Sequence, residues 1–98
     1  MNIKKNLNGE NLEVVLSGRL DTTTAPELEA ALKGALDGIK SLSFDFKELE
    51  YISSAGLRVL LAAQKIMNKQ GSMVIKNVND VIMEVFEVTG FSDILSFE

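Results

Sequence analysis

Apolar and polar residues alternate in three stretches of the chain, which is the pattern of β-strands with one buried face. These stretches are 3–7, 12–16 and 42–46, and the third brings two phenylalanines to the same side. The turn sequence Asn-Gly-Glu-Asn separates the first two stretches, so they are predicted to pair as a hairpin. The sequence Ser17-Gly-Arg is predicted to end the second strand.

A first amphipathic helix is predicted after residue 23, because apolar residues then recur every three or four positions. Thr24 and Glu27 have the spacing of a capping box, in which each side chain bonds the other residue's backbone N–H. Pro26 lies in the first turn, where its missing N–H is tolerated. Gly38 is predicted to end this helix. Its predicted core face consists of Leu28, Ala31, Leu32, Ala35 and Leu36.

Two further helices are predicted in the second half of the chain. The central helix follows a loop that begins near Tyr51, runs to about Gln70 and is ended by Gly71. The last helix is predicted to be capped by Asn79 and stopped by Gly90 in a left-handed conformation. Its predicted core face consists of Val81, Ile82, Val85 and Phe86.

The order of these elements predicts the class of fold. The apolar run 73–75 is too short for a helix and indicates a buried strand, and 94–97 is consistent with a short edge strand. The resulting order β-β-α-β-α-β-α indicates one α/β domain over residues 1–98. We expect a mixed sheet of four to five strands covered by about three to four helices.

The central helix has two apolar sides rather than one. Its predicted core face consists of Val59, Leu60, Ala63, Ile66 and Met67. Gly56 points toward that face, where a glycine permits close packing against the sheet. Leu57 and Leu61 lie on a flank beside Ser54, between the core face and a basic stripe that includes Arg58. From the pattern alone, this flank is either covered by a neighbouring element or contacts a partner.

Composition excludes several classes of function. The 98 residues contain no His and no Cys, so the chain has neither an imidazole base nor a thiolate nucleophile, and an enzyme is not expected. The net charge of −4 without a basic cluster argues against direct nucleic-acid binding. Apolar runs are far shorter than the roughly 20 residues of a membrane span, and no secretory signal is visible at the N-terminus. No cofactor is expected.

Two aspartates, Asp21 and Asp45, lie at or near the ends of predicted strands and are expected to converge with Ser54 at one edge of the sheet. Paired carboxylates can bind a cation or transfer protons. Such residues more often cap loops or remain solvated, and no third ligand stands out. No metal site is therefore assigned.

Ser53 and Ser54 place two hydroxyl groups where the central helix starts. The first N–H groups of a helix have no partner within the helix, and its dipole adds partial positive charge there. A serine can cap these groups, and a phosphate on the serine would interact with them more strongly. From the residues alone, a capped core helix and a phosphorylation site both remain open.

Three blocks of the sequence resemble motifs of the STAS domain, specifically of the bacterial anti-sigma factor antagonists. The N-terminal block is Leu-Ser-Gly-Arg-Leu-Asp at 16–21 followed by Thr-Ala-Pro-Glu-Leu at 24–28. The central block is Phe-Asp-Phe at 44–46 followed by Leu-Glu-Tyr-Ile-Ser-Ser-Ala-Gly-Leu at 49–57. Gly71-Ser-Met-Val-Ile and the segment Val-Phe-Glu-Val-Thr-Gly-Phe ending at Phe91 match the closing elements. The resemblance covers nearly the whole chain.

The resemblance implies a cytoplasmic regulatory switch. In this family the unphosphorylated antagonist binds an anti-sigma factor that is also a serine kinase, which releases the sigma factor. Phosphorylation at the helix start prevents this binding, and a serine phosphatase restores it. The family motif commonly reads Asp-Ser-(Ser or Thr)-Gly, and its modified Ser aligns with Ser54, whereas Ser53 replaces the Asp and offers an alternative acceptor. The residue before Gly56 is Ala55, where the family often has a hydroxyl.

The resemblance also implies a partner surface around this helix start. Its predicted residues are Asp21, Ser53, Ser54, Gly56, Leu57, Arg58 and Leu61. The alternative function is that of a STAS scaffold or regulatory subunit in another signalling or transport assembly.

Overall fold

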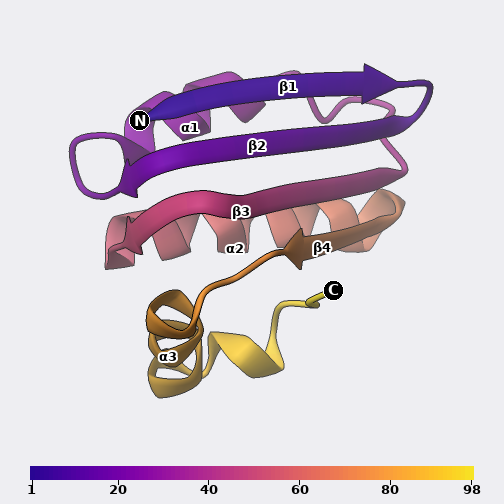
Figure 1. The fold of residues 1–98 in the computed structure, drawn as a ribbon. Helices are drawn as coiled ribbons and strands as arrows, with labels where there is room; N and C mark the ends of the chain where they lie inside the picture. Colours follow the sequence, from indigo (N-terminus) through magenta and orange to yellow (C-terminus); the bar gives the residue numbers. More distant parts are fainter.

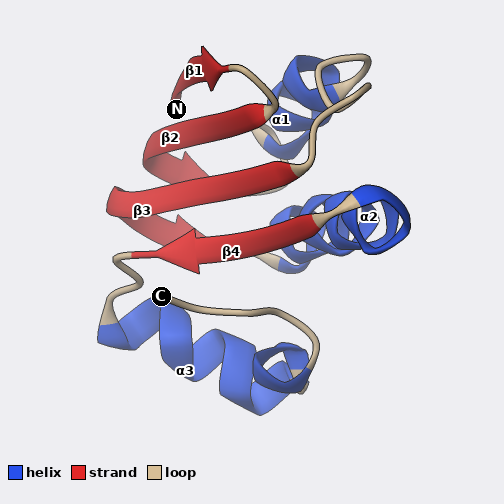
Figure 2. Cartoon of the chain, turned by 90° about the vertical axis from the view of Figure 1, so that its right-hand side faces the viewer, coloured by secondary structure: helices blue, strands red, loops and turns tan.

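The structure is a computed structural model that describes all of residues 1–98, and its strands form one sheet with two helices on one face (Figures 1 and 2). A third helix lies beside the last strand, at the edge of the molecule. The elements in chain order are β1 (Asn2–Asn8), β2 (Asn11–Leu20), α1 (Ala25–Leu32), β3 (Ser41–Ile52), α2 (Ser54–Gln70), β4 (Ser72–Lys76), α3 (Asp80–Thr89) and the 3-10 helix η1 (Phe91–Asp93).

The sheet has the strand order β1-β2-β3-β4 and is mixed, as predicted. β1 runs antiparallel to β2, whereas β3 is parallel to both β2 and β4. Val14, Phe44 and Ile75 lie side by side in this register, and none of them is exposed. The predicted fold class is therefore confirmed, with four strands and three α-helices.

The helices cover the sheet through most of the residues predicted for their core faces. The prediction is wrong for Val81 of α3, which is 62% exposed. α1 and α2 lie on the same face of the sheet (Figure 2). α3 contributes Phe86, which is fully buried and whose ring stacks on Phe46 of β3 at a centroid distance of 6.5 Å. The ring of Phe97 also packs against Phe86, at a centroid distance of 5.3 Å. Aromatic packing thus attaches α3 and the last residues to the sheet.

Two strands are longer than predicted. The prediction that Ser17-Gly-Arg ends the second strand is wrong, because β2 continues to Leu20 through irregularities in its pairing with β3. Gly18 has a φ of 94° there, a conformation that suits glycine because it has no side chain. β3 likewise extends beyond Phe46 to Ile52, since the continued β2 remains its pairing partner.

The first helix is shorter than predicted and starts differently. α1 ends at Leu32 rather than at Gly38, and a series of turns beginning near Gly34 still buries Leu36. The predicted capping box is also wrong. The Thr24 hydroxyl donates to the Arg19 carbonyl at 2.7 Å instead of accepting from the first turn of the helix.

The predicted ends of α2 and α3 are confirmed. Gly71 terminates α2, and a side chain at this position would collide with the Lys40 backbone. The Asn79 side chain accepts from the Ile82 N–H at 2.8 Å, and Gly90 ends α3 with a φ of 82°. The predicted edge strand at 94–97 is reduced to a single bridge between Phe97 and Ile75. None of the helices combines the length and apolar character that crossing a membrane requires.

Candidate functional site

The start of α2 lies at the end of the sheet, beside the end of β2. Ile52, the last residue of β3, pairs with Leu20, the last residue of β2. The Ser53 N–H then donates to the Leu20 carbonyl at 2.9 Å, and the Leu57 N–H donates to the Ser53 carbonyl at 3.0 Å. Backbone hydrogen bonds on both sides of the junction therefore determine where α2 starts.

The two serines at this junction differ in accessibility. Ser53 occupies the cap position of α2, but its hydroxyl oxygen is buried and has no hydrogen-bond partner. Ser54 is the first residue of α2, and it is exposed. The two hydroxyl groups are adjacent in sequence, yet only the hydroxyl of Ser54 lies on an exposed residue.

The electrostatics of this helix start favour an anion. α2 has 17 residues, no side chain caps it, and its first turn carries no acidic residue. Arg58 is exposed four residues after Ser54, which places the two side chains on the same side of the helix. The unpaired N–H groups, the helix dipole and the arginine all contribute positive potential there.

Asp21 organises the turn that leads from β2 into α1. Its carboxylate accepts hydrogen bonds from the Thr23 hydroxyl at 2.8 Å, the Thr23 N–H at 3.0 Å and the Thr24 N–H at 3.1 Å. The hydrogen bond from the Thr23 hydroxyl and those from the two N–H groups lower the pKa of Asp21, and they outweigh the effect of desolvation. Arg19 lies 3.7 Å from the same carboxylate and stacks over Tyr51 at 4.2 Å.

The predicted convergence of Asp21, Asp45 and Ser54 is wrong. Asp45 pairs with Val15 in the middle of β2, so it lies six residues before Asp21 along that strand, a distance of about 20 Å. Its carboxylate accepts from the Asn77 side chain at 3.0 Å and from the Lys47 N–H at 2.9 Å, and these contacts lower its pKa. No three acidic residues lie close enough together to hold a metal ion.

Gly56 packs against the sheet, as predicted. A Cβ atom at this position would lie 2.6 Å from Cγ of Leu20 and 3.0 Å from Cγ1 of Ile52. Real Cβ atoms essentially never approach another atom to 2.6 Å, so any side chain here would displace Leu20 or move α2 away from the sheet.

Leu57 does not lie on an exposed flank. It is only 4% exposed and belongs to the main hydrophobic core, so its predicted position outside the core is wrong. Leu61 is half-buried. Conversely, Ile66 was expected in the core but is 45% exposed. The first turn of α2 packs against both α1 and the end of the sheet. The side of α2 that is buried therefore differs from the core face predicted from the spacing of its apolar residues.

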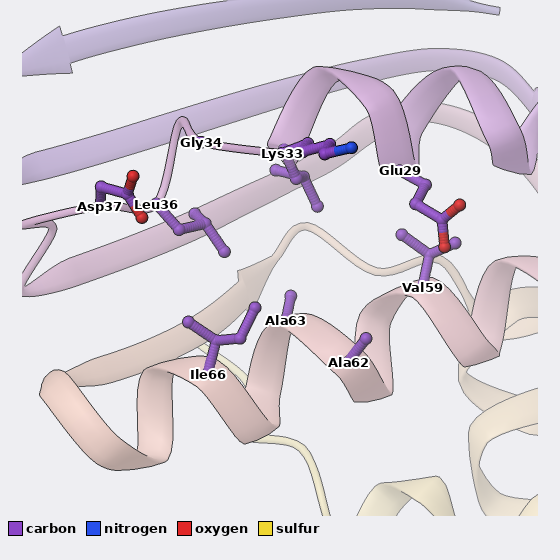
Figure 3. Close-up of a pocket in the computed structure, with 10 residues that line it drawn as sticks. Glu29, Lys33, Gly34, Leu36, Asp37, Val59, Ala62, Ala63 and Ile66 are labelled. Carbon is purple, nitrogen blue, oxygen red and sulfur yellow. The ribbon is translucent and has the colours of Figure 1, made fainter.

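An apolar pocket of about 450 Å³ lies between α2 and the segment formed by the end of α1 and the turns that follow it (Figure 3). In this view, Ala63 and Ile66 of α2 point toward the segment that carries Leu36, whereas Val59 points toward the side chain of Glu29. A smaller hollow of about 180 Å³, lined by Arg58 and Ala55 among others, shares Glu29 and Val59 with the pocket. The two hollows therefore form a groove that extends from the Ser54 end of α2 along the helix.

Sequence reasoning missed this groove. Its signal was present in the sequence, because Gly34 interrupts the region assigned to the first helix. A first helix that ends before Gly34 does not cover the side of α2 that carries Ile66, and this is what the structure shows.

The fold and the serine at the α2 start define a class of protein: a small α/β domain whose mixed sheet carries a helix with a hydroxyl group at its exposed start. The family model described as "Mlab, STAS domain" matches residues 3–96. This chain belongs to the STAS domain family.

Individual relatives agree with this assignment. The chain is 41% identical over 81 residues to BtrV of Bordetella bronchiseptica, provisionally named an anti-sigma factor antagonist, with 81% of this chain and 70% of the relative covered. A crystal structure of an anti-sigma factor antagonist from Mycobacterium paratuberculosis has the same fold, with a TM-score of 0.88, 23% identity, and 98% and 83% of the two chains covered. The Bacillus cell fate determinant SpoIIAA in its phosphorylated form gives a TM-score of 0.77 at 17% identity, covering 99% of this chain and 91% of that one.

Proposed function

We propose that residues 1–98 form one STAS domain that acts as a cytoplasmic anti-sigma factor antagonist and is switched by phosphorylation of Ser54. The unphosphorylated form binds a cognate anti-sigma factor with serine-kinase activity and so releases a sigma factor. The phosphorylated form does not bind, and a serine phosphatase restores it. The relatives' names support the antagonist role.

The observation that carries the choice of Ser54 is the difference between the two serines. Ser54 is exposed at an uncapped helix start, whereas the Ser53 hydroxyl oxygen is buried. A kinase must position the hydroxyl in line with the γ-phosphate of ATP, which requires an accessible side chain. A solved protein of the same fold, SpoIIAA, is described as being in its phosphorylated form, which supports phosphorylation as the kind of modification.

A phosphate at Ser54 would change the binding surface without unfolding the domain. It adds a charge of about −1.5 to −2 at neutral pH. The dipole and free N–H groups of α2 stabilise negative charge at that end, so the folded state is kept. A partner surface that accommodates a neutral serine there instead meets a dianion that must be desolvated or paired.

The proposed partner surface consists of the exposed residues around Ser54. Arg58 is exposed, Leu61 is half-buried, and the groove between α1 and α2 begins at Arg58. Asp21 holds the adjacent turn in place. Gly56 and Leu57 are buried, so we assign them the role of fixing the position of α2 rather than contacting a partner.

Phosphorylation with the cognate kinase tests the site. Incubation of the chain with the kinase and ATP, followed by intact mass spectrometry, is expected to add one phosphate. Ser54→Ala abolishes this addition, and the matched variant Ser53→Ala retains it. Persistent phosphorylation of Ser54→Ala would reject Ser54 as the acceptor.

Partner binding tests the rest of the proposal. The unphosphorylated chain is expected to bind the anti-sigma factor, and Arg58→Ala is expected to slow association by an amount that shrinks as salt rises. Identification of the proteins that co-purify with the chain decides the class of assembly. A stable assembly without any anti-sigma factor would instead support a scaffold or regulatory subunit.

A further inference from the structure

Three valines form a line along the outer side of α3. Val81, Val85 and Val88 are spaced by four and three residues, which places them on one side of the helix. Val81 is 62% exposed, Val88 is 79% exposed, and Val85 between them is half-buried. We call these three residues the valine line. α3 lies beside β4 at the edge of the molecule, away from α1 and α2 (Figures 1 and 2).

Packing of α3 does not depend on Val81 or Val88, which are exposed, whereas Val85 is partly buried against the core. Ile82 and Phe86 attach the helix to the core, and both are completely buried. The valine line surrounds a shallow hollow of about 310 Å³, together with Glu84 and Thr89. The Thr89 hydroxyl donates to the Val85 carbonyl at 2.7 Å, so its proton is already used inside the helix. Grouped apolar side chains rimmed by polar residues are typical of a protein-binding surface.

An acidic line runs parallel to the valine line. Asp80, Glu84 and Glu87 have the same spacing of four and three residues, one position earlier along the helix. Neither of the two ion pairs in the structure, Arg19–Asp21 and Lys76–Glu98, includes any of them. No lysine or arginine follows Lys76 in the sequence. This end of the molecule therefore has a one-sided negative charge next to an exposed apolar line.

We propose that the valine line and its acidic neighbours bind a basic amphipathic helix of a partner protein. Apolar side chains of the partner would cover Val81, Val85 and Val88, and its lysines or arginines would pair with Asp80, Glu84 and Glu87. The acidic line argues for this partner because a basic helix neutralises it. A second copy of this chain would place like charges together, and an anionic membrane would repel it. The surface lies on a different helix from Ser54, so this proposal does not rest on phosphorylation.

The test titrates the isotope-labelled chain with two synthetic helical peptides of about 18 residues each, or about five turns. Both peptides carry the same leucine line, but one is flanked by lysines and the other by glutamates. The lysine peptide is expected to shift the NMR signals of Val81, Val85 and Val88 more than those of the rest of the chain. Its affinity is expected to fall as the salt concentration rises. The glutamate peptide is expected to leave these signals unchanged.

Matched variants separate the apolar and charged contributions. Val88→Ser is expected to weaken the lysine peptide about five- to tenfold, because it removes buried apolar area from the complex. Leu7→Ser alters another exposed apolar residue, which lies on β1 and is 66% exposed, and is expected to have no effect. Glu84→Gln combined with Glu87→Gln should reduce the salt dependence while keeping the thermal melt.

Several outcomes would overturn the proposal. Equal binding of both peptides, or shifts confined to the groove between α1 and α2, would remove the basic helix as the occupant. Concentration-dependent self-association that Val88→Ser abolishes would assign the surface to a second copy. Binding to phosphatidylglycerol vesicles that exceeds peptide binding and depends on Val88 would assign it to a membrane.

Discussion

The starts of α2 and α3 are held in different ways. At α3, the Asn79 side chain caps the helix by accepting from the Ile82 N–H at 2.8 Å. At α2, no side chain caps the helix, and its start is held by the close packing of Gly56 and the burial of Leu57. A start held by packing leaves its N–H groups available to an incoming anion, whereas a capped start has already used one of them.

Leu57→Ala should have the largest effect, because Leu57 is one of the side chains that hold the start of α2. Truncation of a buried leucine costs about 2–5 kcal/mol of unfolding free energy. Urea or thermal unfolding measures the loss. The half-buried Leu61 provides the comparison, and Leu61→Ala should cost less. Equal small losses would mean that Leu57 is exposed in solution.

Gly56→Ala should come next. Alanine in place of a helical glycine normally stabilises a helix by about 0.5–1 kcal/mol. Here the added Cβ would lie 2.6 Å from Leu20 Cγ, so overpacking should instead cost about 1–3 kcal/mol. A thermal melt distinguishes the two because the sign is opposite. A higher melting temperature would contradict close packing as the anchor of α2.

Asn79→Ala should cost about 1 kcal/mol, since it removes a helix cap. The same side chain donates to the Leu49 carbonyl at 3.1 Å, and Asn79→Ala removes that hydrogen bond as well. Asn79→Asp separates the two, because aspartate keeps the acceptor for Ile82 but cannot donate to Leu49. Chemical denaturation of both variants should leave Asn79→Asp the more stable.

The stability of the turn before α1 is expected to depend on pH, because the ionised form of Asp21 accepts the hydrogen bonds that hold this turn. The pKa of this carboxyl is lowered, mainly by the hydrogen bond from the Thr23 hydroxyl. A lowered pKa stabilises the fold above about pH 4, and this contribution is lost as the pH falls through the lowered value. NMR signals of the Thr23 and Thr24 amides should therefore titrate at more acidic pH than an ordinary aspartate. Asp21→Asn should abolish that titration.

Ser53→Ala should have the smallest effect, within about 0.5 kcal/mol of zero. The hydroxyl makes no hydrogen bond, so its removal leaves no partner unsatisfied. The contrast with Asn79→Ala compares two residues at the same cap position. A loss as large as that of Asn79→Ala would show that Ser53 caps α2 in solution.

Local patterns in the sequence predict most of the elements but not their lengths. Alternation locates three of the four strands, a short apolar run locates β4, and helical spacing locates the three α-helices. The extension of β2 through Gly18 depends on pairing with β3, a contact between residues about 30 positions apart that no local pattern contains. The early end of α1 was missed because Leu36 remains buried in the turns and keeps the helical spacing of apolar residues.

The candidate site could be located from the sequence but not resolved into individual roles. The serines at the start of a helix were evident, and the resemblance to a family favoured Ser54. The burial of the Ser53 oxygen depends on the three-dimensional packing of the junction between β3 and α2. The position of Leu57 outside the core was inferred from the faces of an isolated helix, which do not include the end of the sheet, and the family resemblance then favoured an interface role.

The last residues of the chain have a consequence for solubility. The Ile75 N–H donates to the Ser96 carbonyl at 2.9 Å, and the Glu98 N–H donates to the Ile75 carbonyl at 3.0 Å. These bonds occupy backbone groups on the outer edge of β4, which would otherwise be able to pair with a strand of another molecule. The segment thus blocks part of this edge and reduces edge-to-edge aggregation. On the opposite edge of the sheet, Lys4 and Lys5 of β1 provide the charged side chains that commonly serve the same purpose.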